Sequence, residues 1–145
     1  RLSNVGHARS HGVEVTSGWQ MDDLWSLNAT YTHDDTFDED AARRLLRRPR
    51  DKATLGITRL FSEQRAQASL YLLCVGDRLD SDFSTATGIG VLKPYTTLNA
   101  TASWRPWEAV EFFARGDNLT GTVYEEVRGF GVPGIAGYGG MSLYW

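Results

Sequence analysis

The sequence lacks any apolar run of about 18 residues, the length that a membrane-spanning helix requires. Its mean hydropathy of −0.35 is that of an ordinary soluble chain. This value is also compatible with a transmembrane β-barrel, because a barrel places its lipid-facing residues at alternate positions and keeps a low mean hydropathy. Composition therefore leaves both a soluble domain and a membrane barrel open.

Cysteine is almost absent, since Cys74 is the only one among 145 residues. A single cysteine excludes an internal disulfide framework and a cysteine-based zinc site. The formal net charge of −3 argues against general nucleic-acid binding. The chain also begins without an initiator methionine or a signal peptide, and we expect it to be a segment of a longer polypeptide.

The last twelve residues, 134–145, show a strong two-residue period. Counting back from Trp145 in twos gives Leu143 and Met141, followed by small residues and Ile135. The intervening positions are small or carry a polar group, as at Tyr144. This period predicts a strand with one apolar and one wetter face. A strand that runs to the last residue is unusual for a soluble domain, whose ends usually fray.

The same alternation recurs along the chain and predicts about seven strands of roughly ten residues, long enough to cross a hydrocarbon layer when tilted. All four prolines fall at strand starts or in connections, as the hydrogen-bonding of a sheet requires. The predicted strands are 12–21, 24–33, 52–61, 65–75, 95–104, 109–115 and 134–145.

Short and long connections alternate between these strands. The long ones, residues 34–50, 76–92 and 117–134, all fall on the same side of an antiparallel sheet. Outer-membrane barrels have this pattern, with tight periplasmic turns and long extracellular loops.

All five tryptophans lie on the short-turn side of the predicted sheet. Amphipathic indoles at one level form a membrane-interface girdle, and the alternative is chance clustering near turns. Arg59 breaks the apolar face of its strand, but only two residues from a turn, where a lipid-facing arginine costs about 0–1 kcal/mol. The predicted girdle residues are Trp19, Trp25, Trp104, Trp107 and Trp145.

Five segments in order carry a resemblance to a known family. They are N-V-G-x-A-x-x-x-G-V-E at 4–14, R-R-P-R-D-K-A at 47–53, V-G-D-R-L-D-S-D-F at 75–83, D-N-L-T-G-x-x-Y-E at 117–125 and G-F-G-V-P-G at 129–134. With these motifs and the terminal strand, the chain resembles the C-terminal part of a TonB-dependent outer-membrane receptor, closest to the cobalamin and siderophore transporters.

The resemblance implies an all-β fold of antiparallel transmembrane barrel strands. Residues 1–145 would be the C-terminal segment of a barrel of about 22 strands, with the plug domain and the N-terminal strands absent. It also implies a bacterial outer-membrane receptor for active uptake of a scarce nutrient, such as an iron–siderophore chelate or cobalamin, captured at the long loops. Energy would come from the TonB complex through the plug.

Other implied partners are outer-membrane lipid with its lipopolysaccharide and the barrel assembly machinery. The assembly machinery would recognise the terminal strand as an assembly signal, carried by Met141, Leu143, Tyr144 and Trp145.

No further pattern predicts a catalytic, cofactor or metal site. An acidic run, Asp34–Asp40, lacks the spacing of a calcium loop and favours a solvated loop. A basic run, Arg43–Arg50, could contact phosphates of lipopolysaccharide or an anionic ligand, but a loop base balanced by nearby acids is the favoured interpretation. The histidines, His7, His11 and His33, are too scattered for a metal site, and Cys74 is expected to pack on the apolar face.

Two alternatives stay open at this point. One is a small stand-alone outer-membrane barrel with a structural or adhesion role, which would gain an eighth strand from residues 1–5 or from a partner. The other is a soluble β-sandwich binding module, which the level of the tryptophans and the terminal aromatic strand disfavour.

Overall fold

The computed structural model describes residues 6–61, 63 and 65–145. The described residues form strands and turns, and none of them forms a helix long and apolar enough to cross a membrane. The eighth strand considered for residues 1–5 and the start of the 4–14 motif lie outside the described residues. Seven long strands make up the main sheet: β1 (Ala8–Gln20), β2 (Trp25–Asp38), β4 (Asp51–Phe61), β5 (Ala66–Val75), β8 (Tyr95–Trp107), β9 (Val110–Asp117) and β12 (Ala136–Leu143).

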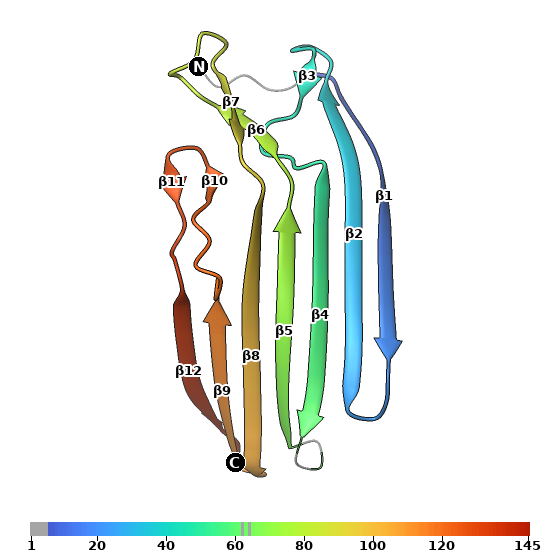
Figure 1. Ribbon diagram of the computed structural model, residues 1–145, viewed down its shortest axis with the longest axis vertical. Helices are drawn as coiled ribbons and strands as arrows, with labels where there is room; N and C mark the ends of the chain where they lie inside the picture. The colour runs from blue at the N-terminus through green and yellow to red at the C-terminus, as the bar shows by residue number, and fades with distance from the viewer. Residues whose placement is uncertain (1–5, 62, 64) are drawn as a thin grey trace.

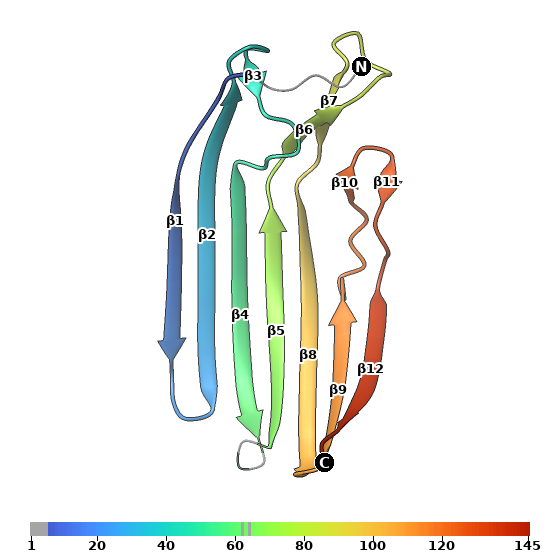
Figure 2. The same cartoon turned by 180° about the vertical axis from the view of Figure 1, so that it is seen from behind.

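These seven strands pair in chain order and are antiparallel throughout (Figure 1). The predicted all-β antiparallel fold and its seven strands are therefore confirmed. Five short strands, four of them in two hairpins, lie at the end of the sheet where the long connections gather (Figures 1 and 2). They are β3 (Arg43–Arg44), β6 (Arg78–Ser81), β7 (Ile89–Leu92), β10 (Glu125–Val127) and β11 (Phe130–Gly131).

The register brings the apolar positions of every long strand to one face of the sheet. Directly paired residues on neighbouring strands point to the same side. One such row runs from Leu27 through Ile57, Leu70 and Ala100 to Gly116. A second row ends on the terminal strand, where Trp104 pairs with Phe112 and Phe112 with Met141. A shift of one residue at any pairing would turn polar side chains into this face.

The apolar face is uncovered, because the sheet is a single layer. Among the described residues, only Val75 and Leu92 are buried apolar side chains. Large apolar residues of the face, such as Val13 and Leu55, are more than half exposed. A sheet with so small a core needs another apolar environment against this face.

The opposite face carries polar side chains that contact one another across strands. The hydroxyl groups of Thr58 and Ser69 lie 2.8 Å apart, and Ser69 is buried. We refer to this side as the polar face.

Several boundaries differ from the sequence prediction. β1 begins at Ala8 instead of residue 12. The terminal strand β12 ends at Leu143 and does not run to the last residue as predicted, because its partner β9 begins at Val110, opposite Leu143. β2 continues through the acidic run to Asp38, because the first residues of β1 pair with Asp34–Asp38. Arg50 forms an ion pair of 2.7 Å with Asp35, which offsets the poor strand propensity of the acidic residues. β8 extends to Trp107 through a bulge opposite β9. The long connections, expected as loops, contain the five short strands.

Gly140 on β12 makes room for an aromatic ring. It pairs with Phe113 on β9, and both residues lie on the polar face. A Cβ atom at position 140 would lie 2.9 Å from two ring carbons of Phe113, closer than side chains approach in folded proteins. Glycine at this position therefore lets Phe113 lie flat over the neighbouring strand.

Gly140→Ala is expected to destabilise the complete protein by about 1–3 kcal/mol, because the new methyl group forces the Phe113 ring out of place. The measurement is the denaturation midpoint of the folded protein in detergent or lipid. Gly137→Ala on the same strand is the matched control, since a Cβ there meets nothing within 4 Å. The double variant Gly140→Ala/Phe113→Leu should recover part of the loss. Equal effects of the two alanine variants would contradict this account.

Candidate functional site

The long connections meet in one loop cluster, which comprises β3, β6, β7, β10, β11 and the residues that join them. The β6–β7 hairpin contacts both of the other long connections. On one side, Arg47 donates its backbone N–H to the carbonyl of Leu79 (2.6 Å). On the other side, Arg78 donates to the carbonyl of Glu125. The three connections are therefore joined into one structure.

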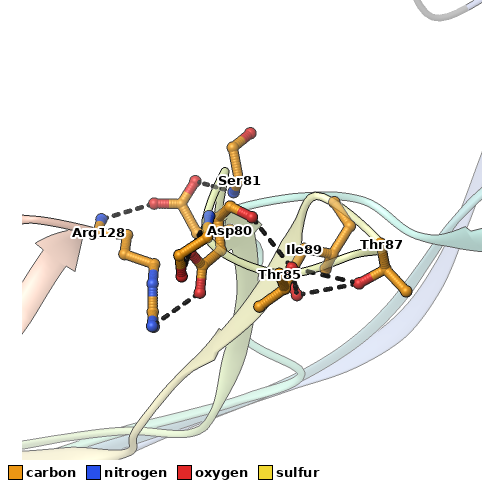
Figure 3. Close-up of polar contacts among 8 residues, drawn as sticks. Asp80, Ser81, Thr85, Thr87, Ile89 and Arg128 are labelled. Carbon is orange, nitrogen blue, oxygen red and sulfur yellow. Dashed lines mark hydrogen bonds and ion pairs between the residues drawn. The ribbon is translucent and has the colours of Figure 1, made fainter.

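Asp80 is the centre of this cluster and has no exposed surface. One carboxylate oxygen accepts hydrogen bonds from Arg47 Nε (2.7 Å) and from the N–H of Ser81 (2.8 Å). The other accepts the backbone N–H of Arg128 at 2.7 Å (Figure 3). Burial raises the pKa of Asp80, but these hydrogen bonds and the Arg47 charge outweigh it and lower the pKa below its usual value. The carboxylate therefore stays charged at neutral pH.

Asp82 fixes the turn that follows β6. Its Oδ1 accepts from the hydroxyl (2.6 Å) and the N–H (3.0 Å) of Ser84, and these bonds lower the pKa of Asp82. Its Oδ2 forms an ion pair with Arg128 Nη2 at 2.8 Å. In the same turn, Thr85 donates to the carbonyl of Ile89 at 3.0 Å (Figure 3).

The three ion pairs that the described residues form between connections have the same polarity. In each of them the β6–β7 connection supplies the aspartate and a neighbouring connection supplies the arginine. Asp77 pairs with Arg44 at 2.8 Å, in the same way that Asp80 pairs with Arg47. Opposite charges on adjacent connections therefore hold the loops together.

Arg78 packs at the base of the cluster and is only 4% exposed. Its guanidinium lies 5.2 Å from the ring centre of Tyr95, a cation–π distance. Tyr95 in turn stacks on Tyr124, with ring centres 3.8 Å apart. This arginine and the two rings connect β6, β8 and the β9–β12 connection.

A hollow of about 550 Å³ opens on the polar face below the β9–β12 connection. Polar-face residues of β5, β8, β9 and β12 form one side of it, and residues 118–134 form the other. Its volume falls in the usual range of small-molecule sites, about 300–1,000 Å³. The lining residues are Tyr71, Leu73, Thr97, Asn99, Thr101, Arg115, Asp117, Asn118, Tyr124, Glu126, Val132, Pro133, Gly134, Ala136 and Tyr138.

Asn118 shapes the wall of the hollow from the connection. It is buried and has a positive φ of 51°, a conformation that asparagine tolerates better than most residues. Its N–H donates to Asn99 Oδ1 (2.9 Å), and its side-chain amide donates to the carbonyls of Thr122 (2.9 Å) and Pro133 (3.4 Å). The side chain of Asn118 therefore joins the two ends of the connection, and its backbone N–H attaches them to β8.

The five predicted girdle tryptophans lie at the short-turn end of the sheet. Trp19, Trp25 and Trp104 share the apolar face through the strand register, and Trp107 pairs with Val110 beyond the bulge. Trp145 follows β12 and is fully exposed. Their role in a membrane interface stays a prediction.

Arg59, the exception on the apolar face, lies between two aromatic rings. Its guanidinium is 4.8 Å from the ring centre of Trp25 and 4.7 Å from that of Phe61. The charge is therefore held among the aromatic residues near the short turns, by cation–π contacts.

Of the four residues predicted as the assembly signal, Met141 and Leu143 lie among the last paired residues of β12, and Tyr144 and Trp145 follow the strand. Met141 and Leu143 are on the apolar face. Tyr144 donates its hydroxyl to Glu111 (2.8 Å), and its ring lies 4.7 Å from the guanidinium of Arg105. Trp145 is the last residue. Their role in assembly also stays a prediction.

The remaining candidates of the sequence are held in local contacts. Three arginines of the basic run pair with acids: Arg44 with Asp77, Arg47 with Asp80, and Arg50 with Asp35. The described residues contain no group of three or more histidine, cysteine, aspartate or glutamate side chains placed to hold a metal ion. Cys74 accepts a hydrogen bond from the hydroxyl of Thr96. Each histidine lies near a carboxylate: His7 near Asp40, His11 near Asp35, and His33 near Asp51.

Sequence reasoning gave no role to Asp80, Arg128 or the hollow. The 75–83 motif contained a usable signal, because Arg78 and Asp80 are charged residues on one face of a short strand. Their partners could not be read from the chain, since Arg47 and Arg128 lie 33 and 48 residues away from Asp80.

Comparison with known proteins gives one family. A family model described as TonB dependent receptor-like, beta-barrel, matches residues 1–119. No curated protein sequence matches the chain.

Solved structures of the same architecture cover almost the whole chain. The copper transporter OprC matches with a TM-score of 0.76 and 18% identity over 95% of this chain and 24% of its own. The ferripyoverdine receptor of the outer membrane of Pseudomonas aeruginosa gives 0.76 and 14% over 94% of this chain and 19% of its own. The ferric yersiniabactin uptake receptor FyuA from Yersinia pestis gives 0.72 and 17% over 95% and 24%. These identities show the shared fold, and the chain spans about a fifth to a quarter of each structure.

Asp80→Asn in the complete protein is expected to loosen all three connections together. The new amide group faces the donors Arg47 and Arg128, so at least one buried donor loses its acceptor. Hydrogen exchange of the loop amides should rise about tenfold in residues 39–50, 76–94 and 118–135. Asp77→Asn is the matched control, because Asp77 is half exposed and pairs with Arg44 alone among the described residues. A rise confined to β6 and β7 would contradict the shared-centre interpretation.

Proposed function

Because the chain belongs to the TonB-dependent receptor-like β-barrel family, we propose that it is the C-terminal barrel segment of a bacterial outer-membrane receptor that takes up a metal chelate. Family members and structural neighbours are transport receptors rather than enzymes, and the receptors of this family are outer-membrane β-barrels. The observation that carries the proposal is the match of the chain to this family model. It agrees with a sheet whose seven long strands place their apolar residues on one face.

The cargo is a metal in the form of a small chelate or ion. The names of the neighbours support this, since they include a copper transporter and receptors for ferripyoverdine and ferric yersiniabactin. Cobalamin, which the sequence resemblance also implied, is the second choice because none of these three names includes it. The loop cluster and the hollow would form part of the vestibule that captures the cargo.

The family also implies what the remainder of the receptor contains. The seven strands would join others to close a barrel of about 22 strands. A plug inside that barrel would contact the energy-coupling TonB complex and drive transport. The apolar face would contact the outer-membrane lipid, including lipopolysaccharide on the loop side.

We propose that the five tryptophans form the periplasmic interface girdle. Along β2, Trp25 and His33 are eight residues apart, about 26 Å at roughly 3.3 Å per residue before tilt. Between them the apolar face carries Leu27, Ala29 and Tyr31. This length compares with the apolar band of outer-membrane barrels, about 25 Å tall.

Fluorescence quenching by brominated lipids tests the girdle in the complete receptor. Variants that keep only Trp25 or only Trp104 should be quenched best by bromine close to the headgroups. In a matched variant, Leu70→Trp in the middle of the apolar face should be quenched best by bromine near the chain ends. No dependence of quenching on bromine depth would overturn the girdle and the lipid contact.

Receptor-dependent metal uptake tests the function. Deleting the gene that carries this segment should abolish uptake of at least one iron chelate or of copper under metal limitation, and the cloned complete gene should restore it. The restored protein should fractionate with the outer membrane, with an intact mass several times 16.2 kDa. An intact mature mass near 16.2 kDa, or unchanged uptake of every metal source, would refute the proposal.

The same fractionation tests the terminal strand as an assembly signal. Trp145→Ser should lower the amount of folded receptor in the outer membrane several-fold without changing synthesis. Trp107→Ser is the control, because it removes an indole from the same level but not from the terminal strand. Equal amounts of the two variants would exclude a special role of the terminal residue.

A further inference from the structure

The hollow on the polar face has a distinctive chemical character. Its strand side presents hydroxyl and amide groups, including Thr101 and Asn99, beside the phenol rings of Tyr71 and Tyr138. Both rings are partly exposed, at 38% and 60%. Such a surface makes hydrogen bonds and ring contacts with a ligand without requiring charge on it.

The charged residues of the hollow carry a net negative charge. Among its lining residues, only Arg115, Asp117 and Glu126 are charged. Arg115 Nε donates to Asp117 Oδ1 at 2.8 Å, so its charge is already neutralised. Glu126 is exposed and forms no ion pair with a described residue at the hollow. A ligand in the hollow therefore meets one uncompensated carboxylate.

The next arginine does not reverse this balance. Arg78 lies behind the stacked rings of Tyr95 and Tyr124, and it is not among the lining residues. It is 4% exposed, and its guanidinium donates to the carbonyl of Glu125. Recognition of a polyanion needs accessible arginine or lysine groups, and the hollow offers no accessible cation free of a carboxylate.

We propose that this hollow receives an uncharged or cationic metal chelate and discriminates against polyanionic chelates. This inference rests on the proposed function and specifies its substrate class. The ligand would place its organic shell against Tyr71 and Tyr138 and hydrogen-bond to the amides and hydroxyls. A chelate with several negative charges would be repelled by Glu126, because the residues that line the hollow offer it no unpaired positive charge.

Competitive uptake by cells that express the complete receptor tests the substrate class. The probes are three ferric chelates of different charge: an uncharged tris-hydroxamate, a cationic tris-hydroxamate with a free amine, and a polyanionic tris-catecholate; cupric ion serves as a fourth metal source. We expect receptor-dependent uptake of an uncharged or cationic source and at least about tenfold weaker uptake of the catecholate.

A charge reversal identifies the group responsible. Glu126→Lys should shift the ratio of catecholate to hydroxamate uptake at least about threefold toward the catecholate. Glu125→Lys is the matched control, because it makes the same charge change at the adjacent residue, which does not line the hollow. The amount of receptor in the outer membrane is measured for each variant, so a folding defect is separated from a change in selectivity.

The outcomes distinguish this inference from the function on which it rests. If the catecholate is taken up as well as the other sources, or if Glu126→Lys and Glu125→Lys change the ratio equally, the inference is overturned while the proposed function stands. If none of the four sources enters through the receptor, the proposed function fails and this inference fails with it.

Discussion

The antiparallel register is the constraint on which the rest of the structure depends. Each long strand alternates apolar and polar side chains, and the pairing aligns the apolar rows from β1 to β12. Because the sheet is a single layer, no second sheet or helix formed by the described residues buries those rows. The result is a broad apolar face on one side and a hydrogen-bonding face on the other. The alternation of apolar and polar residues along the strands therefore determines the chemistry of both faces, including that of the hollow.

The loop cluster is ordered by a different interaction. Long connections carry many backbone polar groups and few apolar ones, so they cannot be ordered by burial of apolar surface alone. Here the order comes from charge pairs that cross from one connection to the next. Asp80 can be buried because three donors meet its carboxylate, and a buried charge without such partners would be costly. The acid-rich middle hairpin and the arginines beside it therefore act as one unit.

Much of the fold could be predicted from the sequence, but little of the cluster could. A period of two is a local signal, so the seven strands, their faces and the level of the tryptophans were visible in the chain. The extension of β2 through Asp34–Asp38 was not visible, because acidic residues have low strand propensity and their pairing with β1 and with Arg50 is a tertiary effect. The same reason hid the role of Asp80, whose partners are distant in sequence. The exposed charge of Glu126 gave no periodic signal at all.

Substitutions on the two faces of the sheet are therefore expected to have different consequences. In the proposed outer-membrane barrel, apolar positions such as Leu55 and Leu70 would face lipid and could be exchanged for other apolar residues with little consequence for recognition, because fluid lipid chains accept many shapes. Positions on the polar face near the loops have no such freedom, since each charge there changes the electrostatic balance of a small space. The backbone that positions Tyr71, Tyr138 and Glu126 is held by sheet register and by Asn118, and neither depends on what those three side chains are. Recognition can consequently change by substitution at the hollow while the sheet, its register and its apolar face stay the same.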